Sequence, residues 1–176
     1  MKFTETVLKG AYIVEMEPHG DERGFFARTW CRQEFEVHGL NPQLAQCSTS
    51  FNKRRGTLRG LHYQADPYQE AKLVRCTRGS IYDLIVDIRP GSETFKKWLS
   101  VELSAEDLLM LYVPEGFAHG FQTLEDDTEV FYQISEFYHP ECSRGISWND
   151  PAFDFRWPIQ ERIMSERDQR FPDFKA

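Results

Sequence analysis

Four side chains, far apart in the sequence, have the chemistry needed to move a proton on and off carbon. His62 lies in residues 57–64 (TLRGLHYQ), Lys72 and Tyr132 lie in later apolar runs, and Asp168 lies near the C-terminus. A histidine serves as a general base near neutral pH, a carboxylate can orient it, a lysine stabilises an oxyanion and a tyrosine returns a proton. This set fits proton abstraction next to a carbonyl, although the spacing does not reveal whether Asp168 pairs with His62.

Arg59 and His62 stand in an apolar, strand-like stretch that includes Leu58, Leu61 and Tyr63. Burying an unpaired charge is costly, so the stretch needs an explanation. One interpretation is a half-exposed strand with a solvated arginine and a hydrogen-bonded core histidine. The other is a strand that lines a pocket, with Arg59 inside it to pair with an anion.

Composition and charge set the class of protein. The chain has 176 residues, of which 40% are hydrophobic and 28% charged, and this predicts one soluble domain over residues 1–176. The formal net charge is −7, which disfavours nucleic acid as a partner. The N-terminus has no apolar signal run and no segment is long enough to span a membrane. Four widely spaced cysteines indicate neither a zinc site nor a disulfide framework, so we expect a cytoplasmic protein.

Short apolar runs dominate the pattern, and helix signals are few. A helix is expected over residues 32–38, stopped by Gly39, and another short one after Ser165, which could cap it. Strands are expected in the runs 11–18, 57–64, 72–77, 81–89, 98–104, 108–116 and 129–138. Many short, evenly spaced strands predict an antiparallel sandwich or barrel, with inward aromatic and arginine side chains that hold a ligand.

The same histidines offer a competing use as metal ligands. Cupin barrels often bind a metal through a His-x-His pair, a Glu and a later His after a Pro-x-Gly turn. Here Pro114, Gly116 and His119 supply the later element, but His62 is followed by Tyr and Gln, so the second histidine of the pair is missing. His62, His119 and Glu70 could still form a site. We expect no metal.

Several motifs together resemble the dTDP-4-dehydrorhamnose 3,5-epimerase family, whose members act on dTDP-4-dehydro-6-deoxy-glucose. They keep the family's order and spacing over nearly the whole chain. The matching stretches are GDERGFF (20–26), GTLRGLHYQ (56–64), KLVRCTRGSIYDLIVDIR (72–89), VELSAE (101–106), PEGFAHGFQTL (114–124), FYHPE (137–141) and RGISWNDP (144–151).

The resemblance implies an all-β fold, a cupin-type jelly-roll barrel with a few short helices. It also implies a homodimer that needs no metal or other cofactor and takes a nucleotide-diphosphate sugar as substrate. His62 matches the catalytic base, Asp168 its paired carboxylate, Lys72 the lysine near the C4 keto oxygen and Tyr132 the catalytic acid. The implied reaction inverts C3 and C5, the two carbons that flank the keto group.

The resemblance also assigns substrate contacts. Arg23, Arg59 and His119 match residues that hold the sugar and diphosphate, and Tyr138 matches the aromatic ring that stacks on the base. The remaining positions that we expect at the substrate are Phe26, Arg28, Gln46, Ser48, Ser143 and Arg167.

Three of these positions depart from the family pattern. Arg28 stands where the family usually has Glu, Ser48 where it has Asn, and Ser143 where an acidic residue is common. An exchange of carboxylate for guanidinium replaces an acceptor with a donor. Arg28 could therefore favour a CDP-sugar, since cytosine presents acceptors at that edge. The competing interpretation is drift at a peripheral contact.

Alternative functions remain open at this point. One is a single-centre epimerase, although Tyr132 favours the double reaction. Another is a non-catalytic nucleotide-sugar-binding cupin, which would need neither base nor acid. A third is a metal-dependent cupin enzyme. In the dimer, Arg23 and the first-strand segment of one chain are expected to complete the other chain's site.

Overall fold

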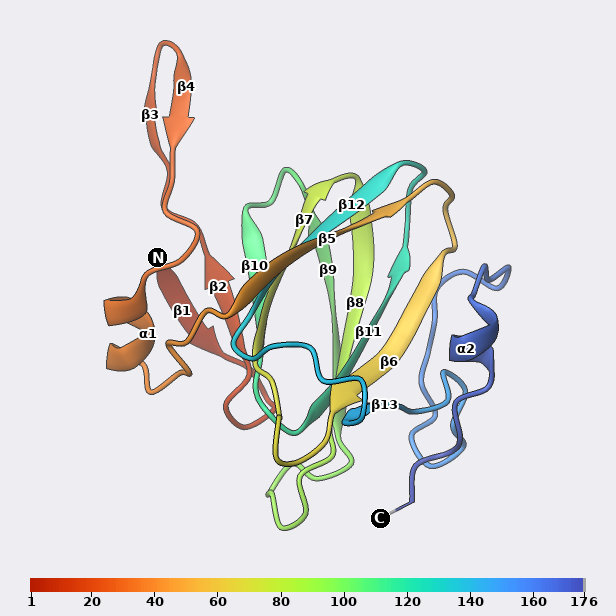
Figure 1. The fold of residues 1–176 in the computed structure, drawn as a ribbon. Coiled ribbons are helices and arrows are strands. Elements are labelled where there is room, and N and C mark those ends of the chain that lie inside the picture. The colour runs from red at the N-terminus through yellow and green to blue at the C-terminus, as the bar shows by residue number, and fades with distance from the viewer. Residues whose placement is uncertain (176) are drawn as a thin grey trace.

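Two antiparallel sheets face each other and enclose the core (Figure 1). The computed structural model describes residues 1–175. The six-stranded sheet has the order β1 (Lys2–Glu5), β2 (Tyr12–Glu15), β10 (Leu109–Val113), β7 (Lys72–Arg78), β12 (Thr128–Ile134), β5 (Gln46–Asn52). The five-stranded sheet has the order β13 (Ser143–Gly145), β6 (Leu58–Gln64), β11 (Phe117–Thr123), β8 (Ser80–Asp87), β9 (Trp98–Ser104). The prediction of an all-β, cupin-type jelly roll is confirmed.

Alternation along the strands decides which side chains enter the space between the sheets. On β7, Val74 and Cys76 join the central core, while Leu73 faces the outer side of its sheet. Lys72 has the same parity as Val74, so it also points inward, at the open end of the barrel. The same face of β7 therefore contributes side chains to the core and to the pocket.

The outer faces are covered by the two ends of the chain. The C-terminal segment packs Phe153 and Trp157 against Leu84 and Val86 of β8, which explains why that strand is apolar on both faces. Helix α1 (Arg32–Val37) places Phe35 over one end of the six-stranded sheet. Neither helix in the part of the chain that the structure describes has the length and apolar character that crossing a membrane requires.

The expected strands and both expected helices are present. Helix α1 ends at Val37 with His38 as its C-cap, and Gly39 follows with φ +68°, a left-handed conformation that glycine adopts without strain. The second helix, α2 (Glu166–Gln169), begins after Ser165, whose hydroxyl accepts a hydrogen bond from the Asp168 amide. The predicted capping role of Ser165 is confirmed.

Six strands were not among the expected runs: β1, β3, β4, β5, β11 and β13. Strand β5 (QCSTSFN) is polar and lies at the edge of its sheet, so it has no apolar alternation to reveal it. Strands β3 (His19–Asp21) and β4 (Gly24–Phe26) form a separate two-stranded hairpin. This arm projects away from the barrel, and all six of its strand residues are exposed (Figure 1).

Candidate active site

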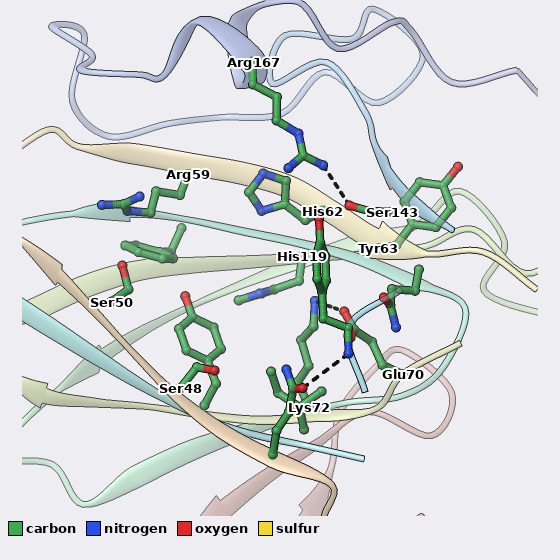
Figure 2. Close-up of a pocket in the computed structure, with 16 residues that line it drawn as sticks. Ser48, Ser50, Arg59, His62, Tyr63, Glu70, Lys72, His119, Ser143 and Arg167 are labelled. Atoms are coloured by element: carbon green, nitrogen blue, oxygen red, sulfur yellow. Dashed lines mark hydrogen bonds and ion pairs between the residues drawn. The ribbon is translucent and has the colours of Figure 1, made fainter. Parts of the chain in front are cut away.

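A pocket opens between the two sheets, and most of the predicted site residues line it (Figure 2). Strands β6 and β11 form one wall, and β5, β7 and β12 form the other. The predicted residues that line it are Gln46, Ser48, Arg59, His62, Lys72, His119, Tyr132, Tyr138, Ser143 and Arg167.

His62 and Asp168 form a hydrogen-bonded pair at this pocket. The distance from His62 Nε2 to Asp168 Oδ1 is 2.9 Å, and the other carboxylate oxygen accepts the Gly60 amide at 3.2 Å. Asp168 is buried, whereas the His62 side chain is 40% exposed and therefore reachable by a ligand. Burial by itself would raise the pKa of Asp168, but the hydrogen bond and charge of His62 outweigh burial and lower it. The carboxylate thus stays ionised beside the imidazole.

A second histidine stands beside the first, with an aspartate of its own. His119 on β11 lies directly across from His62 in the strand register. Its Nε2 is 2.6 Å from Oδ1 of Asp83, and both side chains are buried. The second oxygen of Asp83 has no hydrogen-bond partner among the described residues. Sequence reasoning gave Asp83 no role, although a carboxylate inside an apolar strand was a usable signal.

Lys72 and Tyr132 stand on the opposite wall, in the six-stranded sheet. The Lys72 ammonium is 2.8 Å from Glu70, and both side chains are largely buried. Burial raises the pKa of the Tyr132 phenol, and the nearby Asp83 carboxylate raises it further. Tyr132 is therefore protonated at neutral pH, which is the state that a proton donor requires.

The two walls are close enough for one small ligand to contact both. The ring centroids of His119 and Tyr132, which belong to different sheets, are 6.1 Å apart. In Figure 2, His62 and Arg59 lie on one side of the pocket and Lys72 and Ser48 on the other. His62 and Tyr132 line this pocket from different sheets, so a ligand inside it can contact both.

Arg59 lines the pocket, as one interpretation of its strand expected, and it is solvent-exposed there, as the other expected. Its side chain is exposed at the pocket, and Nε donates to the buried Asn52 at 2.7 Å. The strand reaches the open side of the pocket at this residue, so solvent hydrates the guanidinium and no buried charge has to be compensated. The Asn52 hydrogen bond fixes one edge of the group and leaves the other nitrogens free.

The far end of the pocket carries Tyr138, Ser143 and Arg167. Arg167 Nη2 donates to Ser143 Oγ at 2.7 Å, as the dashed line in Figure 2 shows. The Tyr138 side chain is exposed, and its backbone amide donates to Gln46 at 3.3 Å. An aromatic ring and a guanidinium thus share one exposed end of the site.

Four predicted residues do not line this pocket in their own chain: Asp168, which is hydrogen-bonded to His62, and Arg23, Phe26 and Arg28. Arg23 and Phe26 lie on the projecting arm, where Phe26 is 76% exposed. Arg28 follows the arm and pairs with Glu34 of α1 at 2.8 Å. The structure therefore separates the arm residues from the rest of the predicted set.

Sequence reasoning also missed several pocket residues. Glu70 was considered only as a metal ligand, and Tyr63 and Gln64 were given no role. The pocket residues outside the predicted set are Ser50, Tyr63, Gln64, Glu70, Phe121 and Ile134. Strand parity relative to His62 and Tyr132 would have placed Gln64 and Ile134, because each lies two residues from one of them.

The candidate metal ligands are each occupied by another side chain. His62 binds Asp168, His119 binds Asp83, and Glu70 binds Lys72. Within residues 1–175, no three His, Cys, Asp or Glu side chains gather as a metal site would require.

Comparisons with known proteins agree with one family. The family model described as dTDP-4-dehydrorhamnose 3,5-epimerase matches residues 5–176. A dTDP-4-dehydrorhamnose 3,5-epimerase of Shigella flexneri is 42% identical and covers 98% of this chain and 97% of its own length. The chain belongs to the dTDP-4-dehydrorhamnose 3,5-epimerase family.

Solved structures give the same result. The crystal structure of the Elizabethkingia anophelis dTDP-4-dehydrorhamnose 3,5-epimerase matches with a TM-score of 0.95 and 42% identity, covering 99% of this chain and 96% of its own. The Bacillus anthracis enzyme, solved with TDP and PPi bound, has a TM-score of 0.95 and 39% identity, with coverage of 98% and 99%.

Proposed function

We propose that this protein is an isomerase that converts dTDP-4-dehydro-6-deoxy-D-glucose into dTDP-4-dehydro-L-rhamnose by inverting C3 and C5. One observation carries the proposal. A histidine paired with a buried aspartate faces a protonated tyrosine and a lysine across a pocket between two sheets. Family membership supports the same reaction.

His62 acts as the base. Asp168 engages Nε2 and so favours the tautomer that carries its proton there, which leaves Nδ1 as the proton acceptor. The proton that leaves C3 or C5 goes to His62, and the bonding electrons move onto the C4 oxygen as an enolate. Both carbons flank the same keto group, so one base serves two inversions.

Lys72 and Tyr132 complete the reaction. The ammonium of Lys72, held by Glu70, stabilises the enolate oxygen, and Tyr132 delivers a proton to the carbon from the face opposite His62. The carbon is inverted because removal and return of the proton occur on different faces. His62 then loses its proton to solvent, and Tyr132 regains one.

The substrate's anionic and aromatic parts lie at the pocket's exposed groups. Arg59 pairs with the diphosphate through the nitrogens that Asn52 leaves free. Tyr138 stacks on the base, with Arg167 and Ser143 beside it. His119, oriented by Asp83, contacts the sugar. We take the base to be thymine and not cytosine, because the family and the similar proteins are named for a dTDP sugar.

We propose a homodimer in which the arm of one chain reaches its partner's pocket. The arm exposes Phe25 and Phe26 by 59% and 76%, which is unfavourable unless another surface covers them. On the outer face of the six-stranded sheet, Arg75 is half-buried, and its Nε has no hydrogen-bond partner among residues 1–175. A second copy would cover the two phenylalanines and supply a hydrogen-bond partner for Arg75. It would also bring Arg23 to the diphosphate.

Mixing two inactive variants tests this arrangement. Light scattering should give twice the chain mass. Co-expression of His62→Ala with Arg23→Ala should restore activity, because the heterodimer holds one site with both native residues. A fully active monomer, or the absence of restored activity in a verified heterodimer, contradicts the shared site.

One comparison separates the enzyme from a binding protein. His62→Ala should lose turnover of dTDP-4-dehydro-6-deoxy-D-glucose and still bind dTDP with an affinity within about threefold of the wild type, because the base contacts the sugar carbons and not the nucleotide. Equal turnover in both proteins would refute the proposed base. Elemental analysis of the purified enzyme addresses the metal alternative, since a stoichiometric metal that turnover requires would overturn the mechanism.

We also propose a cytoplasmic location. Cys76 is buried and its thiol donates to the carbonyls of Arg78 and Gly79, an arrangement that needs a reduced sulfur.

A further inference from the structure

A buried amide that the reaction does not use lies at the edge of the pocket. Gln64 follows His62 by two residues on β6 and is 4% exposed. Its Nε2 donates to the carbonyls of Tyr68 at 2.9 Å and Phe137 at 3.1 Å, and its Oε1 accepts the His139 amide at 2.6 Å. Both amide hydrogens are therefore in use, and none is left for a ligand.

These partners lie in two different loops. Tyr68 belongs to the loop between β6 and β7, and Phe137 and His139 belong to the loop between β12 and β13. The Tyr68 and His139 rings also stack, with centroids 3.6 Å apart and planes 4° apart. The two loops are therefore connected twice, by the buried Gln64 side chain and by the partly exposed stack of Tyr68 on His139.

The second loop carries Tyr138 between the two residues that Gln64 holds. The Tyr138 side chain is 54% exposed, so few contacts of its own keep the ring in place. Its amide has a 3.3 Å hydrogen bond to Gln46. The position of the ring thus depends on backbone that is anchored immediately before it by Phe137 and immediately after it by His139.

We infer that Gln64 is a positioning residue for nucleotide recognition. It fixes the backbone on both sides of Tyr138 and so holds the ring ready for the base before the substrate arrives. A preformed ring loses less conformational freedom on binding, so the anchor acts on nucleotide affinity. It does not act on proton transfer, because His62 is held by Asp168 and Lys72 by Glu70. This inference rests on the proposed function, in which Tyr138 stacks on the base.

Gln64→Met removes the amide and keeps the length of the side chain. We expect the Kd for dTDP, measured by calorimetry, and the KM for the nucleotide sugar to rise about tenfold, with kcat within about twofold of the wild type. A fall in kcat with unchanged KM would overturn the inference.

Gln122→Met is the matched control. Gln122 on β11 is also a fully buried amide, and it donates to and accepts from the Ile159 backbone at 2.9 and 3.0 Å, outside the pocket. This variant should lose comparable stability and keep its dTDP affinity. A similar loss of affinity in the control would show that general destabilisation is responsible, and would overturn the inference.

A double-mutant cycle distinguishes an anchor from a merely structural residue. In a Tyr138→Ala background, Gln64→Met should produce little further change in dTDP affinity, because the ring that it positions is gone. An undiminished effect in that background overturns the inference. If the wild type neither binds dTDP nor turns over the sugar, the proposed function fails; if it does both and Gln64→Met binds dTDP equally well, only the inference fails.

Tyr68→Ala provides a second variant if Gln64→Met does not fold. Its ring is 38% exposed, so its removal is tolerated better, and it loosens the same two loops by abolishing the stack with His139. The dTDP Kd should rise while kcat stays constant. An unchanged Kd would contradict the positioning of Tyr138 through these loops.

Discussion

At the scale of single residues, each of the two neighbouring histidines has its own aspartate, but the two pairs differ in exposure. His62 is open to the pocket, whereas His119 and Asp83 are both buried. An exposed imidazole can meet a carbon acid and exchange its proton with solvent. A buried one is better suited to holding a substrate group in place.

The tautomer argument makes a direct prediction. Asp168→Asn keeps the size of the side chain but removes the charge that stabilises the protonated His62 imidazole. We expect kcat to fall about a hundredfold or more, with dTDP affinity unchanged. Steady-state kinetics and dTDP titration check both parts. If kcat stays within about threefold of the wild type, Asp168 does not support the base.

At the scale of elements, the close approach of β6 and β11 positions His62 and His119. Gly60 has φ +121°, and a Cβ at this residue would lie 2.5 Å from Gly120 Cα and 2.8 Å from the His119 carbonyl. The Gly60 amide also donates to Asp168. Only glycine permits this contact between the strands.

Gly60→Ala should therefore destabilise the fold and displace the base. We expect a loss of about 2 kcal/mol in the free energy of unfolding and a fall in kcat. Gly91→Ala is the control, because Gly91 also has a positive φ of +83° but open space around it. Urea unfolding and kinetics measure both variants. Equal losses of unfolding free energy in the two variants would contradict a steric clash between a Cβ at residue 60 and strand β11.

The loop after β8 depends on a buried carboxylate. Both oxygens of Asp87 accept hydrogen bonds, from Arg89, Ser92 and Thr94. Burial alone would raise the pKa of Asp87, but these donors lower it from 3.8 to about 2. Because the folded-state pKa is depressed, the carboxylate stabilises the fold above pH 3.8, and this contribution is lost as the pH falls through about 2.

Asp87→Asn should therefore destabilise the protein by about 3 kcal/mol at pH 7, because it leaves Arg89 without its counter-charge. The difference in the free energy of unfolding between this variant and the wild type should stay constant down to about pH 5 and become smaller below about pH 4. Urea unfolding across this range measures the difference. A gap that does not narrow at low pH would show that the charge of Asp87 does not stabilise the loop.

The element patterns also explain what could be predicted. Alternating strands such as β9 were visible because one face is apolar, and Gly39 marked the end of α1. Strand β5 was missed because its inward residues line a polar pocket and its edge position demands no apolar face. Functional sites break the patterns that identify core strands.

At the scale of the whole molecule, the family resemblance predicted the site residues and the His62–Asp168 pair, but not the His119–Asp83 pair. Neither the His62–Asp168 nor the His119–Asp83 contact follows from sequence spacing, because each joins separate elements. The apolar neighbours of Arg59 could not decide between a solvated arginine and one that lines a pocket, because the open side of the pocket is not visible in the sequence. The exposed arm likewise became evident only from the arrangement in space (Figure 1).

The central claim is that a sugar lies between two sheets, with the base on one and the acid on the other. We would measure deuterium uptake when the wild type and Tyr132→Phe act on dTDP-4-dehydro-6-deoxy-D-glucose in D₂O, by mass spectrometry and NMR. The wild type should take up two deuterons and invert C3 and C5. Tyr132→Phe should take up deuterium at the original face without inversion, because His62 alone returns the label. Uptake of one deuteron by the wild type would mean a single-centre epimerase, and undiminished inversion in Tyr132→Phe would contradict the two-sided mechanism.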